Sequence, residues 1–192
     1  MECLKLSPDC SKGPHGPIGL WDVSAVTSMY DMFFKTAFNG DISKWGVSKV
    51  TDMQHMFNRA SSFTSDFSNW DVSKVTDMSA TFSHASSFNS DLSKWDVSKV
   101  TSMYVMFQSA SSFNADLSKW DVSKVDNMYH MFYGASLFNA DLSKWDVSKV
   151  TSMQNMFREA SKFAQTLCGA WKTNSKADKH GMFLNSPGKM CD

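Results

Sequence analysis

The chain has 192 residues, and its nineteen basic and nineteen acidic side chains cancel to a formal net charge of zero. This balance provides no general attraction to nucleic acid or to an anionic membrane, so we expect neither as a partner. The chain also has no run of about 20 apolar residues, which argues against a transmembrane helix. Aromatic residues make up 14% of the sequence, too much apolar bulk for a disordered chain.

Residues 1–17 form a lead-in or N-terminal cap without a repeat pattern. They contain three of the four prolines, and Gly13-Pro14-His15-Gly16-Pro17 is incompatible with a helix or a central strand. The segment shows neither a basic start followed by an apolar stretch nor a lipidation signature. It fits a cytosolic protein and equally a mature secreted fragment with an added Met1, and both readings stay open.

Residues 18–163 form a repeat array. A shortened first unit begins at Ile18, and five complete units of 25 residues follow. The complete units begin at Phe38, Phe63, Phe88, Phe113 and Phe138. A fixed period of this length predicts a solenoid, in which each unit, or coil, buries its apolar edge against its neighbours.

Each coil has two kinds of apolar spacing. Trp95 and Val97 alternate with the period of a short strand, whereas Val100, Met103 and Phe107 have the three- and four-residue steps of a helical face. We therefore predict an α/β repeat with one short parallel strand and one short helix in each coil. The Trp, Val, Met and Phe rows are expected to form the core.

Residues 164–192 are predicted to be a degenerate capping coil. Trp171 keeps the repeat frame, but Lys176 and Lys179 occupy positions that are apolar in earlier coils, as expected for a terminal coil exposed to water. Cys168 and Cys191 lie about one coil apart, which is within disulfide reach in a stacked array, and we predict a bond between them. Cys3 and Cys10 are a second candidate pair. Four reduced thiols in a cytosolic protein are the alternative.

The repeat motif Phe-Asn-x-Asp-Leu-Ser-x-Trp-Asp-Val-Ser-x-Val-Thr-x-Met-x-x-Met-Phe resembles that of the BspA-like surface proteins of mycoplasmas, other bacteria, protists and algae. Its Leu-x-x-Trp-x-Val-x-x-Val part also resembles the leucine-rich-repeat pattern. The resemblance covers residues 18–163 closely and 164–192 loosely. It implies a leucine-rich-repeat-like solenoid, often secreted or on cell surfaces, linked to adhesion and protein contacts, with no catalytic residue to carry over.

The sequence offers no catalytic constellation. Its five histidines do not recur with a metal-ligand spacing, and there is no phosphate-binding glycine loop or Cys-x-x-Cys motif. The serines recur in every coil, so none has the special surroundings that a nucleophile needs. We therefore expect neither an enzyme nor a resident cofactor.

Two acidic rows repeat along the array, one beginning at Asp41 and one at Asp22, with lysines beside them. We expect the first row to bond to turn backbone and the second to point out of the sheet onto a concave face. The concave-face binding candidates are Lys94, Asp96, Lys119, Asp121, Lys144 and Asp146. The alternative is that these rows are purely structural, with opposite charges that neutralise each other. Two minor alternatives are calcium bound between the carboxylates and ice bound to the threonines that repeat along the array.

These features favour a non-enzymatic recognition or adhesion module that binds a protein or glycan partner through exposed polar rows. The competing hypothesis is a structural spacer or scaffold in a larger assembly.

Overall fold

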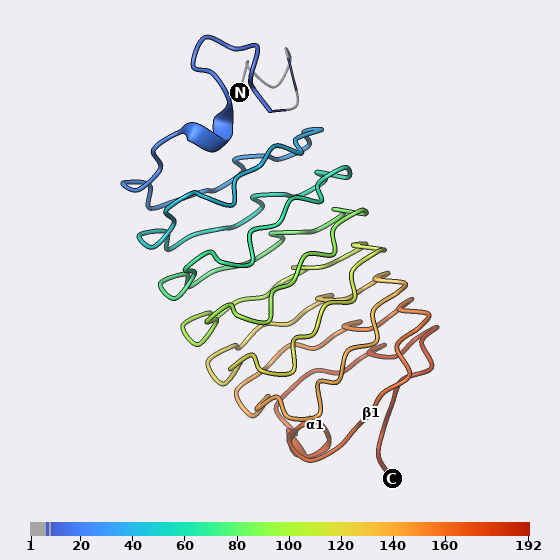
Figure 1. Cartoon of the computed structure of the whole chain (residues 1–192). Helices are drawn as coiled ribbons and strands as arrows, with labels where there is room; N and C mark the ends of the chain where they lie inside the picture. Colours follow the sequence, from blue (N-terminus) through green and yellow to red (C-terminus); the bar gives the residue numbers. More distant parts are fainter. Residues whose placement is uncertain (1–6, 8) are drawn as a thin grey trace.

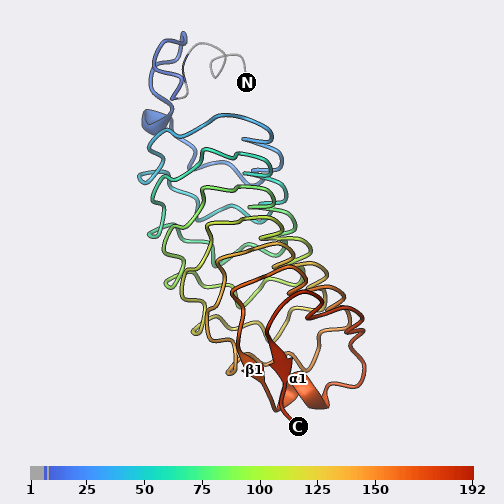
Figure 2. The same cartoon turned by 90° about the vertical axis from the view of Figure 1, so that its right-hand side faces the viewer.

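The computed structural model describes Ser7 and residues 9–192, and it shows a stack of similar coils with the two ends of the chain at opposite ends of the stack (Figure 1; Figure 2). Named elements are few in this described part. They are the 3-10 helix η2 (Ile18–Leu20), strand β1 (Thr166–Leu167), helix α1 (Ala170–Thr173) and strand β2 (Lys189–Met190). Strands β1 and β2 pair in parallel with Thr166 opposite Lys189 and Leu167 opposite Met190. Most of the chain is therefore held by bonds between turns and extended segments.

Backbone hydrogen bonds join each coil to the next. The N–H groups of Met53, His55 and Phe57 donate to carbonyls of the following coil at 3.2, 2.9 and 2.8 Å. The Thr76 N–H donates the other way, to the Thr51 carbonyl at 2.9 Å. Isolated parallel bridges mark this junction along the stack at Ser28, Asp52, Asp77, Ser102, Asn127, Ser152 and Asp178.

The predicted helix in each coil is wrong. The segment 103–109 has positive φ at Val105 (48°) and Ser109 (55°), and comparable pairs recur in the other coils, for example at His55 and Arg59. A helix would use its N–H groups within the coil, whereas here every second N–H points to the next coil and the intervening ones close tight turns. We call this segment and its equivalents (29–35, 53–59, 78–84, 128–134, 153–159 and 179–185) the turn edge.

The predicted Trp-x-Val strand is also wrong. Trp95 and Val97 lie between two turns, closed by the Trp95 N–H on the Leu92 carbonyl at 3.1 Å and by the Val100 N–H on the Val97 carbonyl at 2.9 Å. Because these turns use the backbone groups locally, the bridge to the neighbouring coil forms at Ser102 instead.

The predicted core rows are confirmed. In the five complete coils, the Trp, Val, Met and Phe rows are buried, and Thr81 replaces one Met and is also buried. Phenylalanine rings stack from coil to coil, with ring centroids 5.5 Å apart between Phe82 and Phe107 and between Phe107 and Phe132. Indoles stack similarly, as in Trp120 on Trp145 at 6.4 Å. One continuous apolar core therefore runs along the stack.

Two pairs of cysteines were expected to bond. Cys168 and Cys191 carry free thiols, so the predicted bond between them is wrong for this structure. The contact itself is present, because both residues directly follow the paired strands β1 and β2 and the Cys191 N–H donates to the Leu167 carbonyl at 3.1 Å. A hydrogen bond with the Cys191 side chain raises the pKa of the Cys168 thiol. Cys10 is disulfide-bonded, and the expectation for Cys3 lies outside the described residues.

Candidate binding surfaces

The acidic rows are built into turns. Asp91 accepts a hydrogen bond from the Ser93 N–H at 2.8 Å, and Asp96 accepts one from the Ser98 N–H at 3.0 Å. The same contact recurs for the other aspartates of both rows, so turn bonding is confirmed for the first row and extends to the second. Hydrogen bonds from the Ser98 hydroxyl and N–H hold the pKa of the Asp96 carboxyl below its usual range. The aspartates thus stabilise the turns of the coil.

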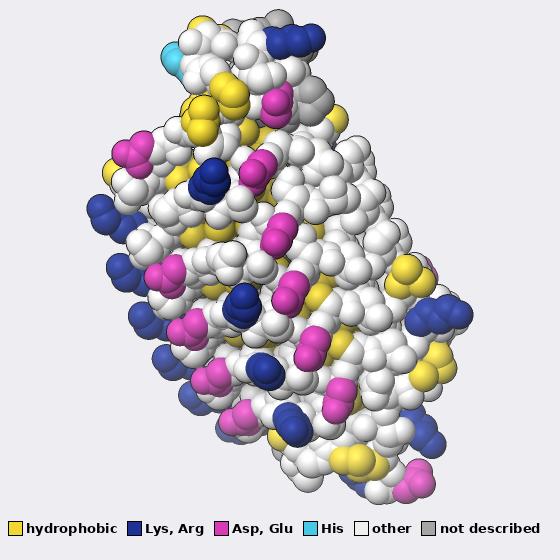
Figure 3. All heavy atoms as spheres, in the orientation of Figure 1, with side chains coloured by type: hydrophobic (Ala, Val, Ile, Leu, Met, Phe, Trp, Pro, Cys, Tyr) yellow, Lys and Arg dark blue, Asp and Glu magenta, His cyan; other side chains and the backbone are white. Residues whose placement is uncertain are grey.

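The six binding candidates are exposed side chains, and Figure 3 shows acidic and basic side chains in rows along the stack. Each carboxylate couples to a lysine three residues later in the chain. The Lys94 amine acts on the Asp91 carboxylate, three residues earlier, and it is the Lys99 amine that acts on Asp96. Within the described chain, no lysine of these rows forms an ion pair with an acidic side chain.

Sequence reasoning missed an aromatic cluster on the turn edge. Tyr104 stacks on Tyr129 with centroids 5.4 Å apart, Tyr129 stacks on His130 at 3.9 Å, and His130 stacks on Tyr133 at 5.0 Å. The Arg158 guanidinium lies 5.8 Å from the Tyr133 ring centre. Tyr104 is 42% exposed. We call these five residues the aromatic cluster.

The polar contacts of the cluster centre on His130. Its Nε2 lies 3.1 Å from Asn155 Nδ2. Burial, followed by the nearby Arg158 charge, lowers the pKa of His130 below that of an ordinary histidine. The imidazole is therefore mainly neutral at pH 7, and with Nε2 facing the Asn155 amide donor it serves as an acceptor there.

A signal for this cluster existed in the sequence. Twelve of the 25 positions hold the same residue in all five complete units, whereas four positions of the turn edge differ from unit to unit. The first of these positions is occupied by Gln54, Ser79, Tyr104, Tyr129 and Gln154. The rows that repeat predicted the core, whereas Tyr104, Tyr129 and Tyr133 lie at positions that vary between coils.

Comparison with known families adds one finding. The family model described as "Mycoplasma protein of unknown function, DUF285" matches residues 5–116 and 87–190. The chain belongs to this family. No curated protein and no solved structure matches it.

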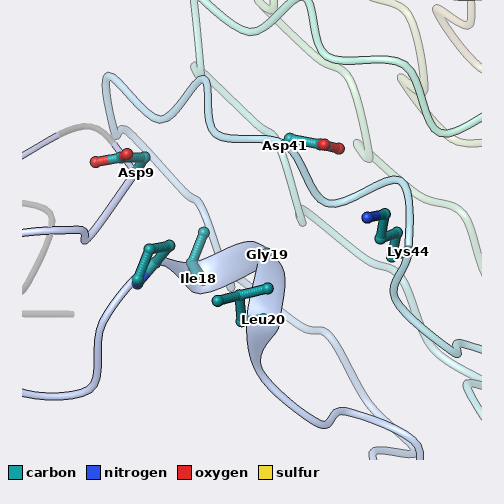
Figure 4. A pocket seen from close by; sticks show the side chains of 7 residues that line it. Asp9, Ile18, Gly19, Leu20, Asp41 and Lys44 are labelled. Carbon is teal, nitrogen blue, oxygen red and sulfur yellow. The ribbon is translucent and has the colours of Figure 1, made fainter.

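A hollow near the N-terminal end of this DUF285 protein is lined by both charged and apolar side chains. It is lined by Asp9, Ile18, Leu20, Asp41 and Lys44, among others, and Figure 4 shows the Asp9 and Asp41 carboxylates pointing away from one another. Each carboxylate also accepts a hydrogen bond from a nearby serine N–H. The two carboxylates of this hollow are therefore engaged in local turns.

Two features are absent from the described residues of the DUF285 chain. They contain no group of three or more His, Cys, Asp or Glu side chains placed to hold a metal ion. None of their helices has the length and apolar character needed to cross a membrane.

Proposed function

We propose that this protein is a non-enzymatic recognition or adhesion module, a leucine-rich-repeat-like solenoid of the BspA-like kind that binds a protein or glycan partner. The observation that supports this most is the aromatic cluster, because Tyr104 is exposed, the other members are half-buried, and all occupy positions that differ between coils. Uniform positions build the stack, and the positions that differ are the ones free to specify a partner.

The chemistry of the cluster suits such partners. Tyrosine rings present a flat apolar face at low cost in side-chain entropy, and they are enriched at binding surfaces. Asn155 and Arg158 border these rings and supply hydrogen-bond donors. An apolar face with polar groups at its rim can take a sugar ring or a peptide side chain.

The lysine rows are a second possible contact within the same function. Lys94, Lys119 and Lys144 are exposed and lack ion pairs within the described chain, whereas the neighbouring aspartates are engaged in turns. We propose that these amines form short-range ion pairs with acidic groups of a partner, and that the rings provide the specific contact.

The test compares two triple variants in pull-downs from a cell-surface fraction and on a glycan array. One variant carries Tyr104→Ser, Tyr129→Ser and Tyr133→Ser, and the other carries Lys94→Ser, Lys119→Ser and Lys144→Ser. Circular dichroism and thermal unfolding first establish that both variants keep the wild-type fold.

Loss of a partner by the tyrosine variant alone supports the proposal. Loss by the lysine variant alone would move the contact to the charged rows. A wild-type protein that retains no partner on either platform would overturn the recognition function and favour a structural spacer.

A further inference from the structure

The backbone hydrogen bonds between the turn edges of successive coils all run in the same direction. The N–H groups of Met153, Asn155, Phe157 and Glu159 donate to carbonyls of the last coil at 2.8 to 2.9 Å. Each earlier turn edge donates to the coil that follows it in the same way. Every coil within the stack therefore presents N–H groups toward the C-terminal end and carbonyl groups toward the N-terminal end.

At the C-terminal end these donors have no acceptor. The last turn edge places the N–H groups of Lys179, Gly181, Phe183 and Asn185 at the equivalent positions, and none of them donates to any group of the described chain. The chain beyond them returns to pair as β2 with β1, in another part of the coil. An open row of backbone donors thus remains at this end.

At the N-terminal end it is the acceptors that have no partner among the described residues. The carbonyls of Ser28, Tyr30, Met32 and Phe34 accept no hydrogen bond from any described residue. In the second coil, the equivalent carbonyls of Asp52, Gln54, Met56 and Asn58 all accept one. The two ends therefore present complementary rows with the same two-residue spacing.

Apolar side chains flank both rows. At the C-terminal end, Met182, Phe183, Leu184 and Met190 line a shallow hollow, and Leu184 is 48% exposed. The Phe183 ring stacks on Phe157, with centroids 5.7 Å apart. At the other end, Tyr30 is 54% exposed. Exposed sheet edges beside apolar side chains are templates for pairing with another chain.

We propose that the C-terminal turn edge of one molecule docks on the N-terminal turn edge of a second copy, which continues the coil-to-coil ladder head to tail. The second copy is the fitting occupant because it presents acceptors where the first presents donors. The zero net charge imposes no overall repulsion between copies. Such a contact uses different patches on the two partners, so it leaves an open end at each side and extends into a chain of molecules.

This inference concerns a different surface from the aromatic cluster and does not depend on the proposed function. The test is sedimentation velocity of the whole chain over a range of concentrations. Leu184→Glu blocks the donor end, and Tyr30→Glu blocks the acceptor end. Leu137→Glu is the matched control, because Leu137 is also 50% exposed but belongs to an inner coil.

We expect the average mass of the wild type and of Leu137→Glu to rise with concentration, whereas Leu184→Glu and Tyr30→Glu each remain monomeric. An equimolar mixture of the two end variants should form a dimer and stop there, because each variant contributes one intact end and blocks further growth.

Three results would overturn the inference. The first is a wild type that stays monomeric up to about 1 mM, where even weak specific contacts are populated. The second is equal loss of association in the Leu137 control. The third is self-association of Tyr30→Glu alone, which would indicate a symmetric contact between two C-terminal ends.

Discussion

The tryptophan row contains one irregular member, and it allows a test of what the indole hydrogen bonds contribute. Trp120 Nε1 donates to the Leu92 carbonyl at 3.0 Å, and indoles of other coils make the equivalent bond. Trp95 Nε1 is buried without a partner, although both indoles are only 4% exposed.

The cause lies in Phe67, which stands where other coils have Leu or Ile. Its ring lies 5.1 Å from the Trp70 ring and 5.5 Å from the Trp95 ring, tilted by about 45° to both. By the pattern of the other coils, the Phe67 carbonyl would accept the Trp95 bond. The larger ring occupies the stack between the two indoles, and the bond is not formed.

We predict that Trp120→Phe destabilises the protein more than Trp95→Phe. Both changes remove the same ring volume from equally buried sites, so this loss cancels in the comparison. Trp120→Phe also loses the hydrogen bond of the indole N–H, a net contribution of about 1 kcal/mol. The Leu92 carbonyl is not left unpaired, because it still accepts a hydrogen bond from the Trp95 backbone N–H. Trp95→Phe instead removes an unsatisfied buried donor that costs about 1–3 kcal/mol. The difference should be about 3 kcal/mol.

Scanning calorimetry measures this difference as a gap in melting temperature of roughly 6–12 °C for a chain of this size. A double-mutant cycle sharpens the test. In a Phe67→Leu background the Trp95 bond can form, so Trp95→Phe should become as costly as Trp120→Phe. Equal melting temperatures for the two single variants in the wild-type background would refute the reasoning.

Three further predictions concern the C-terminal coil and the ionisable groups. Asn174 is buried and its Nδ2 donates to the carbonyls of Val147 and Val150 at 2.8 Å each, so Asn174→Ala should lower the free energy of unfolding by about 2 kcal/mol in urea titrations. Burial lowers the pKa of His130, so below about pH 6.5 the unfolded state binds a proton that the folded state excludes, and stability falls. Hydrogen bonds in the turns lower the pKa values of the aspartate rows, so the stability that these carboxylates contribute is present at higher pH and is lost below about pH 4. Urea midpoints should therefore decline in two stages on acidification, and a midpoint that rises between pH 7 and 5 would contradict this. Oxidised glutathione should link Cys168 and Cys191, releasing two molecules of glutathione as two thiols become one disulfide. The disulfide-bonded product should be more stable by about 3 kcal/mol. In thiol titrations, the Cys168→Ser variant should form no intramolecular disulfide between these positions.

Much of the architecture was predictable because a repeat fixes which residues share an environment. The period placed Trp95 and Phe107 in buried rows and put Cys168 beside Cys191. The local conformation was not predictable from spacing, because three- and four-residue apolar steps arise from a helix and also from a compact pair of turns. Residues such as Val105 adopt positive φ only because bonds to the neighbouring coil compensate the strain, and these bonds are invisible in a single unit.

Among the candidate sites, too, the features set by local sequence were predictable and those set by contacts between coils were not. The turn bonds of Asp91 follow from a local preference of aspartate two residues before a serine N–H, and local chemistry is readable from sequence. The cluster of Tyr104, Tyr129 and Tyr133 depends on which positions of successive coils face one another. That requires the register of the stack, which spacing alone does not supply.

The turn edges at the two ends of the stack and the exposed lysine rows differ in the kind of contact that they can form. Donors on the turn edge point toward the C-terminal end, but the Thr76 N–H and the Ser87 N–H donate toward the N-terminal end, as do the indoles. These opposed ladders partly cancel the dipole of the stack as a whole. The complementarity of the ends is therefore confined to the turn edge and rests on short-range pairing of backbone groups. Salt screens such pairing little, whereas it weakens contacts made by the exposed lysine rows, so the ionic-strength dependence of an observed association indicates which surface forms it.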